Sequence, residues 1–253
     1  DLYLGGKMRG LNILILTDIH YMSRANHLCP KEERKTRLGL ELIERVLNSV
    51  DISDIDLILL LGDLVDNGDA PGVKEDIMDL YSVLKSTGKP IIVTPGNHDP
   101  DPQLVLDIFN DYEGLHDING YQIVSFVDEY NEKDEAKRCM AKMESVFSQV
   151  DAIRPIIALQ HNPIYPHIDR VYPYNLKNAD DITKFYMEKE VLLSISGHAH
   201  WGIATTLKDD VGYLTCPALC ERPYKYTVLS LKGKEYNAIE YKLILEGNDE
   251  IRK

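Results

Sequence analysis

Through its first two hundred residues, the chain alternates short apolar runs with segments whose apolar residues recur at helical spacing. The runs predict strands over residues 11–17, 57–61, 90–94, 122–127, 155–159 and 191–196. The helical spacing predicts helices over residues 32–50, 73–84, 102–110, 132–150 and 180–189. Runs that are apolar at consecutive positions are typical of parallel strands covered on both faces. The order of elements therefore indicates βαβ units.

Beyond residue 200 the pattern changes, because no helix is predicted between the apolar runs. Strands are predicted there over residues 203–207, 213–216, 226–231 and 236–245. We expect antiparallel strands that complete a second sheet. No internal repeat, low-complexity stretch or linker interrupts the chain, so residues 1–253 are predicted to form a single domain. Residues 1–7, ahead of Met8, are set aside as a candidate added segment.

The composition is that of a soluble globular protein, with 44% hydrophobic and 27% charged residues. No apolar run approaches the length of a membrane span and no secretory signal is visible, so we expect a cytoplasmic protein with no membrane partner. The four cysteines lack a Cys-x-x-Cys spacing and are expected to be reduced. A net charge of −13 argues against a nucleic-acid polymer as partner. It leaves room for a small phosphorylated substrate, because bound metal ions reverse the local field.

Residue types that bind metals follow five of the apolar runs directly. They are Asp18 and His20, Asp63, Asn97 and His98, His161, and His198 and His200. Taken singly, an Asp-x-His or a Gly-Asp pair is most often a chance match or a turn. Together they are informative, because the carboxyl ends of strands are where open α/β folds collect ligands. The sequence therefore predicts a functional site at these strand ends.

The chemistry of these donors indicates the kind of metal. Oxygen and imidazole donors without thiolates suit divalent Mn, Fe, Zn or Co. One tetrahedral ion cannot use so many donors. Two neighbouring ions would use them all, and Asp63, in the middle of the predicted sheet, is the natural carboxylate to bridge them.

These motifs resemble those of the calcineurin-like metallophosphoesterases. The resemblance spans about residues 11–231 and rests on Asp18-Ile19-His20, Gly62-Asp63-Leu64-Val65-Asp66, Gly96-Asn97-His98-Asp99, His161 and Gly197-His198-Ala199-His200. It implies an α/β fold, a four-layer αββα sandwich of two mixed β-sheets flanked by helices. It also implies that one metal is held by Asp18, His20 and His200. The other would be held by Asn97, His161 and His198, with Asp63 as the bridge.

The function implied is metal-dependent hydrolysis of phosphate esters on a small phosphorylated metabolite. Two cations lower the pKa of a shared water, and the bridging hydroxide can attack phosphorus. In length and motifs the chain is similar to small cyclic-nucleotide phosphodiesterases, but phosphomonoesterases share every metal motif, so mono- and diesterase activity both stay open. The alternative is a non-catalytic scaffold on the same fold. We disfavour it because every ligand position is occupied.

Two residues beside the ligands have predicted auxiliary roles. The resemblance implies that His98 is the histidine beside the phosphate that does not bind metal. We expect Asp99 to orient it, so that His98 stabilises the transition state or protonates the leaving alkoxide. Asp66 either accepts the second N–H of a ligand imidazole or caps the turn with Asn67 and Gly68. Both interpretations of Asp66 are kept.

Substrate selectivity is expected to come from two irregular segments that follow ligand-bearing strand ends, residues 21–30 and 164–178. The candidate substrate-binding residues are Arg170, Tyr172 and His27. An aromatic face in the second segment can stack on a base, and Arg170 can pair with a second anionic group. The alternative is that these tyrosines only cover the edge of the sheet. The sequence does not indicate an oligomeric state.

Overall fold

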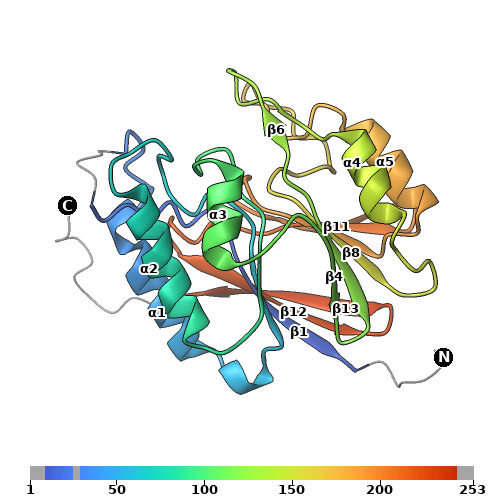
Figure 1. The fold of residues 1–253 in the computed structure, drawn as a ribbon, viewed down its shortest axis with the longest axis horizontal. Helices are drawn as coiled ribbons and strands as arrows, with labels where there is room; N and C mark the ends of the chain where they lie inside the picture. The colour runs from blue at the N-terminus through green and yellow to red at the C-terminus, as the bar shows by residue number, and fades with distance from the viewer. Residues whose placement is uncertain (1–8, 25–28, 244–253) are drawn as a thin grey trace.

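A computed structural model describes residues 9–24 and 29–243 of the chain and contains two large β-sheets (Figure 1). The first sheet has the strand order β13-β12-β1-β2-β3. Its strands are β1 (Leu11–Leu16), β2 (Leu57–Leu60), β3 (Ile91–Val93), β12 (Lys225–Lys232) and β13 (Glu235–Lys242). β1, β2 and β3 run parallel, and β12 and β13 are antiparallel to their neighbours.

The second sheet has the order β10-β11-β9-β8-β5-β4. Its strands are β4 (Gly114–Ile118), β5 (Tyr121–Ser125), β8 (Ile156–Leu159), β9 (Leu193–Ser196), β10 (Ile203–Lys208) and β11 (Val211–Thr215). The four central strands run parallel, and the two edge strands are antiparallel to their neighbours. A small hairpin pairs β6 (Glu129–Tyr130) with β7 (Ala136–Lys137). Both large sheets are therefore mixed.

Helices cover the outer face of each sheet (Figure 1). The helices are α1 (Gly39–Ser49), α2 (Val73–Lys85), α3 (Pro102–Phe109), α4 (Met140–Phe147) and α5 (Ala179–Glu188), with 3-10 turns at Thr36–Leu38 and Ile52–Asp54. The first three pack on the first sheet, and α4 and α5 pack on the second. Among the described residues, no helix has the length and apolarity needed to cross a membrane. The predicted four-layer αββα sandwich is confirmed.

Because side chains alternate along β1, this strand contributes both to the core under the helices and to the core between the two sheets. Leu14 and Leu16 point to the helices and join the outer core with α1, α2 and α3. Ile13 and Ile15 point the other way and pack between the two sheets. All four are buried, and each contributes about 1.5–3 kcal/mol by leaving water. Because both faces of β1 are buried in this way, its carboxyl end has a fixed position.

The C-terminal strands differ from the prediction. They do not all complete a second sheet, because β12 and β13 return to the first sheet while β10 and β11 extend the second. β12 lies beside β1 with Leu11 opposite Leu231, and β11 runs parallel to β9. Pairing between segments so distant in sequence leaves no trace in the local hydrophobic period, which is why it was not anticipated.

Several element boundaries were also predicted incorrectly. The helix expected over residues 132–150 begins only at Met140, because the preceding residues form β7 and Cys139 is extended. The helix expected from residue 32 is α1, which begins at Gly39 after a 3-10 turn. β4 was missed because it carries polar residues such as His116 and Asp117.

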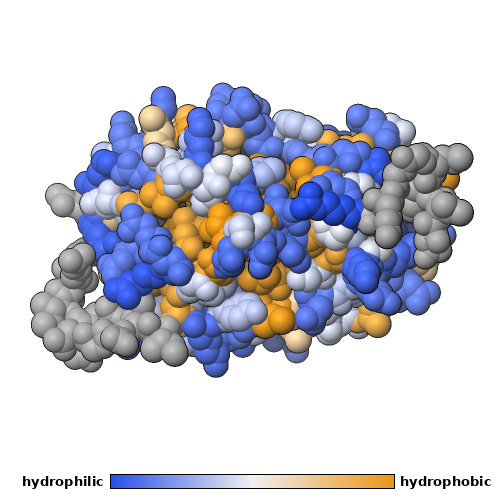
Figure 2. All heavy atoms as spheres, turned by 90° about the horizontal axis from the view of Figure 1, so that it is seen from below, coloured by the Kyte–Doolittle hydropathy of each residue, from blue (hydrophilic) through white to orange (hydrophobic). Residues whose placement is uncertain are grey.

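The surface that faces downward in Figure 1 mixes polar and apolar side chains. Figure 2 shows apolar side chains near the middle of this face, with hydrophilic ones among and around them. Exposed apolar side chains interspersed with charged ones are ordinary for a protein surface. We assign no function to this face.

Candidate metal centre

The carboxyl ends of five strands from both sheets meet at one place, and the predicted ligands lie there. Backbone hydrogen bonds join the segments that carry them. Asp18 N donates to Gly62 O at 3.0 Å, His20 N donates to Asp63 O at 2.9 Å, and Gly197 N donates to His161 O at 2.9 Å. The last bond links β8 and β9 of the second sheet, and the first two link β1 and β2 of the first. The site thus spans the junction of the two sheets.

Two groups of donor atoms share one carboxylate. Within each group, all ligand atoms lie within 4.8 Å of one another. The first group consists of Asp18, His20, Asp63 and His200, and the second contains Asp63, His161 and His198. The aspartates and histidines are thus grouped as the resemblance implied, with Asp63 common to both, while Asn97, the remaining predicted ligand, is in neither group.

The backbone at the site is held in a conformation that side chains usually avoid. Asp18, His20, Asp63 and His198 have φ values of 51°, 48°, 50° and 66°. Left-handed backbone costs a non-glycine residue roughly 1–2 kcal/mol. Strain of this kind is concentrated at functional sites, where the surrounding structure maintains it. Here the hydrogen bonds between strands hold the turns that aim these side chains at a common point.

Glycines next to the ligands leave room for them. A Cβ at Gly62 or Gly96 would collide with the imidazole of His161, and one at Gly197 would collide with Thr17 and Asp18. Gly62 also has φ of 88°. The glycines of the motifs therefore allow the strand ends to approach closely enough for the ligands to converge.

Three candidate ligand imidazoles are oriented by polar contacts on the nitrogen that faces away from the centre. His161 Nδ1 donates to Leu61 O at 2.6 Å, which leaves Nε2 facing Asp63 Oδ2 at 3.4 Å. His20 Nδ1 lies 3.0 Å from Asp66 Oδ1. A partner on the outer nitrogen fixes the tautomer and the ring plane, as in known metal sites. Of the two interpretations of Asp66, the structure supports contact with a ligand imidazole.

The third oriented imidazole has a partner that sequence reasoning missed. His200 Nδ1 lies 2.5 Å from Glu221 Oε1. Its Nε2 lies 3.2 Å from Asp18 Oδ1 and 3.3 Å from His20 Nε2. Glu221 follows β11 in an irregular segment and belongs to no motif, so no local signal could have identified it.

Asn97 provides the clearest sign that the centre suits metal ions. Its Oδ1 atom is buried and accepts no hydrogen bond from the described part of the chain. Leaving a buried acceptor unpaired costs about 1–3 kcal/mol. A cation beside Asn97 Oδ1 would satisfy it, and the second group of donors is where Asn97 was expected to bind. The oxygen and imidazole donors present therefore fit a pair of divalent ions.

The charged side chains of the centre raise the pKa values of some of their neighbours and lower those of others. Burial disfavours every ionised form, but the charges of Asp63 and Asp18 raise the pKa of His161 to about 10. Asp18 and Glu221 likewise outweigh burial and raise the pKa of His200 to about 9. In turn, these histidines hold the pKa values of Asp18 and Asp63 below the ordinary range despite burial. Without metal, the centre is therefore held together by ion pairs with His161 and His200 protonated.

The other two ligand histidines behave in the opposite way. Burial lowers the pKa of His20 to about 4, although its hydrogen bond to Asp66 opposes the change. Burial and the charge of His161 lower the pKa of His198 to about 3. Both rings are therefore neutral at physiological pH and present a lone pair without first losing a proton.

His98 lies beside the centre, but its supporting contacts differ from the prediction. Its Nδ1 lies 2.7 Å from the carbonyl oxygen of Asp66, and its backbone N–H donates to Asp63 Oδ1 at 2.9 Å. The expected role of Asp99 in orienting His98 is wrong. The Asp99 carboxylate accepts hydrogen bonds from the backbone N–H groups of Leu64, Val65 and Gly96.

Asp99 thus joins the loop after β2 to the loop after β3. Burial and the nearby charge of Asp63 raise its pKa to about 7, against the opposing effect of the N–H donors of Gly96 and Val65. It supports the loops that carry Asp63 and Asn97 and does not face the cleft as a catalytic group. Motif spacing alone could not distinguish these roles, because Asp99 is adjacent to His98 in either case.

A cleft of about 630 Å³ opens over the centre. Arg170 and Tyr172, two of the three predicted substrate-binding residues, line it. The third, His27, lies outside the described residues. The Arg170 guanidinium stacks on Trp201, with its Cζ 4.0 Å from the ring centroid, and Tyr174 contacts the same ring. Trp201 was not predicted, although it directly follows the last ligand, His200.

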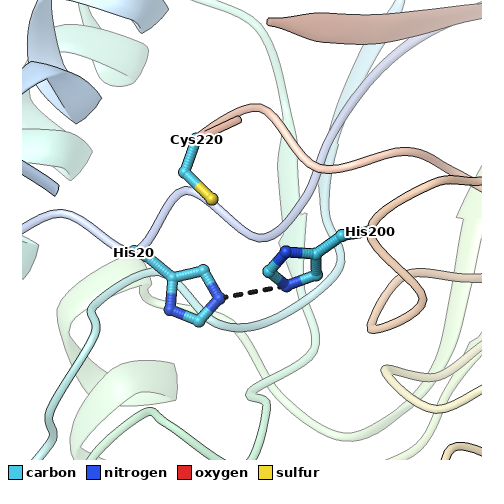
Figure 3. A group of neighbouring side chains, drawn as sticks. All are labelled: His20, His200 and Cys220. Atoms are coloured by element: carbon cyan, nitrogen blue, oxygen red, sulfur yellow. Dashed lines mark hydrogen bonds between the residues drawn. The ribbon is translucent and has the colours of Figure 1, made fainter. Parts of the chain in front are cut away.

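Cys220 is a further neighbour of the first donor group. Its thiol lies within 4.8 Å of ligand atoms of His20 and His200. Figure 3 shows its sulfur pointing toward the space above these two imidazoles. Burial raises the pKa of the Cys220 thiol well above its ordinary value, so in the metal-free protein the thiol is neutral. Cys220 therefore adds a sulfur donor beside the oxygen and imidazole donors of the first group.

The structure is a mixed αββα sandwich with two candidate donor groups at the strand ends, and comparison with known proteins gives its family. The family model described as calcineurin-like phosphoesterase matches residues 11–202. The chain belongs to this family.

Individual relatives agree with this assignment. A Fibrobacter succinogenes protein described as a "probable cyclic nucleotide phosphodiesterase" is 26% identical over 182 residues, a match that spans 66% of each chain. The fold is similar to that of a dimetal phosphatase from Danio rerio, with a TM-score of 0.70 at 13% identity, covering 92% of this chain and 98% of that one. It is also similar to that of a Thermus thermophilus protein, TT1561, with a TM-score of 0.62 at 14% identity, covering 91% and 98%.

Proposed function

We propose that this protein hydrolyses phosphate esters of a small metabolite with the help of two divalent metal ions. The observation that carries the proposal is the pair of donor groups that share Asp63 beneath an open cleft. Asp18, His20 and His200 would hold one ion, and Asn97, His161 and His198 the other. The donor types suit Mn, Fe, Zn or Co. When bound, two such ions lower the pKa of water and neutralise charge on the phosphoryl oxygens.

The side chains of this protein have separable tasks in that reaction. Asp66 and Glu221 hold the imidazoles of His20 and His200 in place from behind. His98 stands at the cleft wall, where it would stabilise charge on the phosphoryl group or give a proton to the leaving alkoxide. The imidazole of His98 is fixed by a hydrogen bond from its Nδ1 to the carbonyl oxygen of Asp66. This bond directs Nε2 of His98 away from that carbonyl.

For the substrate class we propose a nucleotide or a cyclic nucleotide. Three aromatic residues of the cleft, Tyr172, Tyr174 and Trp201, offer faces on which a base can stack. Arg170 is held over Trp201 and can pair with an anionic group away from the scissile phosphate. The name of the Fibrobacter succinogenes relative supports the same class.

A non-catalytic scaffold is the second candidate, and the donor geometry disfavours it. An interaction surface does not require two groups of buried donors that share one carboxylate, so their presence favours a metal-dependent function. The two functions differ in metal uptake, because a scaffold is under no constraint to bind two ions.

A panel of phosphate mono- and diesters tests the proposed function. The protein, loaded with Mn and freed of excess metal, is assayed against small aryl phosphates, nucleotides and cyclic nucleotides. We expect turnover of an aryl ester, with higher kcat/KM for at least one nucleotide ester. Metal uptake with no turnover of any ester contradicts the proposed hydrolysis, and uptake of no metal supports the scaffold.

A further inference from the structure

Arg34 is a buried cation beside the proposed centre that no motif includes. It lies between the strand end that carries His20 and the 3-10 turn at Thr36–Leu38. Its side chain is only 9% exposed, and it lines the cleft over the metal centre. An arginine side chain is rarely buried to this extent unless its charge is paired. The structure provides one such partner, since Nη1 lies 3.1 Å from Asp66 Oδ1.

The guanidinium is not satisfied by that contact. Arg34 has five N–H donors in a fixed fork. Its Nε atom is buried and has no acceptor in the described part of the chain. Burial lowers the pKa of Arg34, but Cys220, Asp63 and Asp66 together raise it above the ordinary value, so the group stays charged. A buried, charged donor set that is only partly used is suited to an anionic ligand.

The imidazole of His98 is the nearest neighbour of this donor on the cleft side. His98 Nδ1 must donate to the carbonyl oxygen of Asp66, because a carbonyl oxygen only accepts. In the neutral ring, Nε2 then carries a lone pair, and it lies 3.5 Å from Arg34 Nη1. An anionic oxygen bound in front of these two groups would lie within reach of the guanidinium.

We propose that Arg34 is a catalytic residue that binds an anionic oxygen of the phosphoryl group at the metal centre. The proposal rests on the phosphoesterase function proposed above. The guanidinium would use one N–H group on Asp66 and others on the phosphoryl oxygen, so that its position is fixed before substrate arrives. Charge already in place where it develops in the transition state lowers the barrier without reorganisation.

The competing explanation is that Arg34 acts only through Asp66. It would then keep that carboxylate in contact with His20 and have no contact with substrate. Loss of Arg34 would in that case disturb the metal bound by His20, whereas loss of a phosphate ligand would leave both ions in place. Metal content therefore separates the two explanations.

The test uses Arg34→Ala and Arg34→Lys, with Arg154→Ala as matched control. Arg154 also pairs with an aspartate, Asp117, but is not among the residues that line the cleft. For each Mn-loaded protein, three quantities are measured: bound metal, the dissociation constant of inorganic phosphate by calorimetry, and kcat/KM for an aryl phosphate.

We expect Arg34→Ala to keep both ions, to bind phosphate about 10- to 100-fold more weakly and to lose about 100-fold in kcat/KM. The phosphate affinity and kcat/KM of Arg34→Lys should lie between those of Arg34→Ala and the wild type, because an ammonium keeps the charge but lacks the planar array of N–H donors of a guanidinium. Arg154→Ala should match the wild type in all three measurements.

Two results would overturn the role of Arg34. One is phosphate binding and turnover within twofold of the wild type in Arg34→Ala, and the other is loss of one metal ion from that variant. If Arg34→Ala does not fold, unchanged phosphate affinity in Arg34→Lys overturns it as well. If the wild type hydrolyses no ester, the proposed function fails, while the phosphate dissociation constants still decide whether Arg34 binds the anion.

Discussion

Glu221 Oε1 lies 2.5 Å from His200 Nδ1, on the side of the ring opposite the other ligands. The contact holds His200 Nε2 toward Asp18 and lowers the pKa of Glu221 despite its partial burial. Glu221 has the same relation to His200 as Asp66 has to His20. The two carboxylates thus fix the two imidazoles of one donor group from outside.

Glu221→Gln is expected to weaken the ion held by Asp18, His20 and His200 by about 10- to 100-fold, the usual effect of losing such a partner. The ion at His161 and His198 should be retained. Metal content after dialysis against graded chelator measures both. Glu188→Gln, which alters an exposed helical pair with Lys184, serves as control. Equal loss of both ions would show that Glu221 does not act through His200 alone.

Metal binding is expected to release protons. At a pH of about 7.5, His161 and His200 are protonated in the metal-free protein, because their pKa values are raised to about 10 and about 9. Each must lose its proton to bind a metal, so the two histidines should release about two protons per chain, and ionisation of a metal-bound water adds to this number. The contribution of the histidines should fall toward zero as pH rises above about 10, and metal affinity should increase over the same range. Calorimetry in buffers of different ionisation enthalpy measures the release, and its absence near neutral pH would contradict the assigned protonation.

His98→Ala is expected to keep both ions and to lose turnover by about 10²–10⁴-fold, the range for a proton-transfer group. The loss should be smaller for aryl esters, whose leaving groups need less protonation, than for alkyl esters. The test measures the turnover rates of the variant on an aryl ester and on an alkyl ester, together with its metal content. The exposed His167, replaced by Ala, is the control. Equal losses for the two esters would mean that His98 stabilises phosphoryl charge and does not act as the acid.

Arg170→Ala and Tyr172→Ala are expected to raise KM for a nucleotide ester while sparing a small aryl phosphate. Both residues line the cleft, Arg170 over Trp201 and Tyr172 with its Oη 3.5 Å from Asn97 Nδ2. They would contribute ground-state binding to the rest of the substrate. Steady-state kinetics on the two substrates tests this. A parallel change on both substrates would assign these residues to the structure of the site instead of to its selectivity.

The meeting of the candidate ligands at one place was predictable because residue chemistry and local pattern coincide at these strand ends. A buried parallel strand must end at a sheet edge, and residues such as Asp63 and His161 follow such strands directly. The left-handed backbone at Asp18 and His198 could not be predicted from the sequence, because these residue types adopt either sign of φ and the surrounding contacts decide between them.

What could not be predicted depends on contacts between distant segments. Glu221 reaches His200, and Arg34 reaches Asp66, from irregular segments whose position is set by the fold. The return of β12 to the first sheet brings the segment before it, including Cys220, close to His20. For Asp99, a contact was predicted that does not form. Asp99 is adjacent to His98 in sequence, but its carboxylate accepts a hydrogen bond from the backbone N–H of Gly96.

The central claim is that two metal ions, joined at Asp63, are together required for ester hydrolysis. Its most direct test is a titration of the metal-free protein with Mn, in which bound metal and turnover of an aryl phosphate ester are followed in the same sample. The account predicts that binding saturates at about two ions per chain and that turnover appears with the second ion. In Asp63→Asn, turnover should be lost. Full turnover with one ion bound, or saturation with two ions and no hydrolysis, would contradict the account.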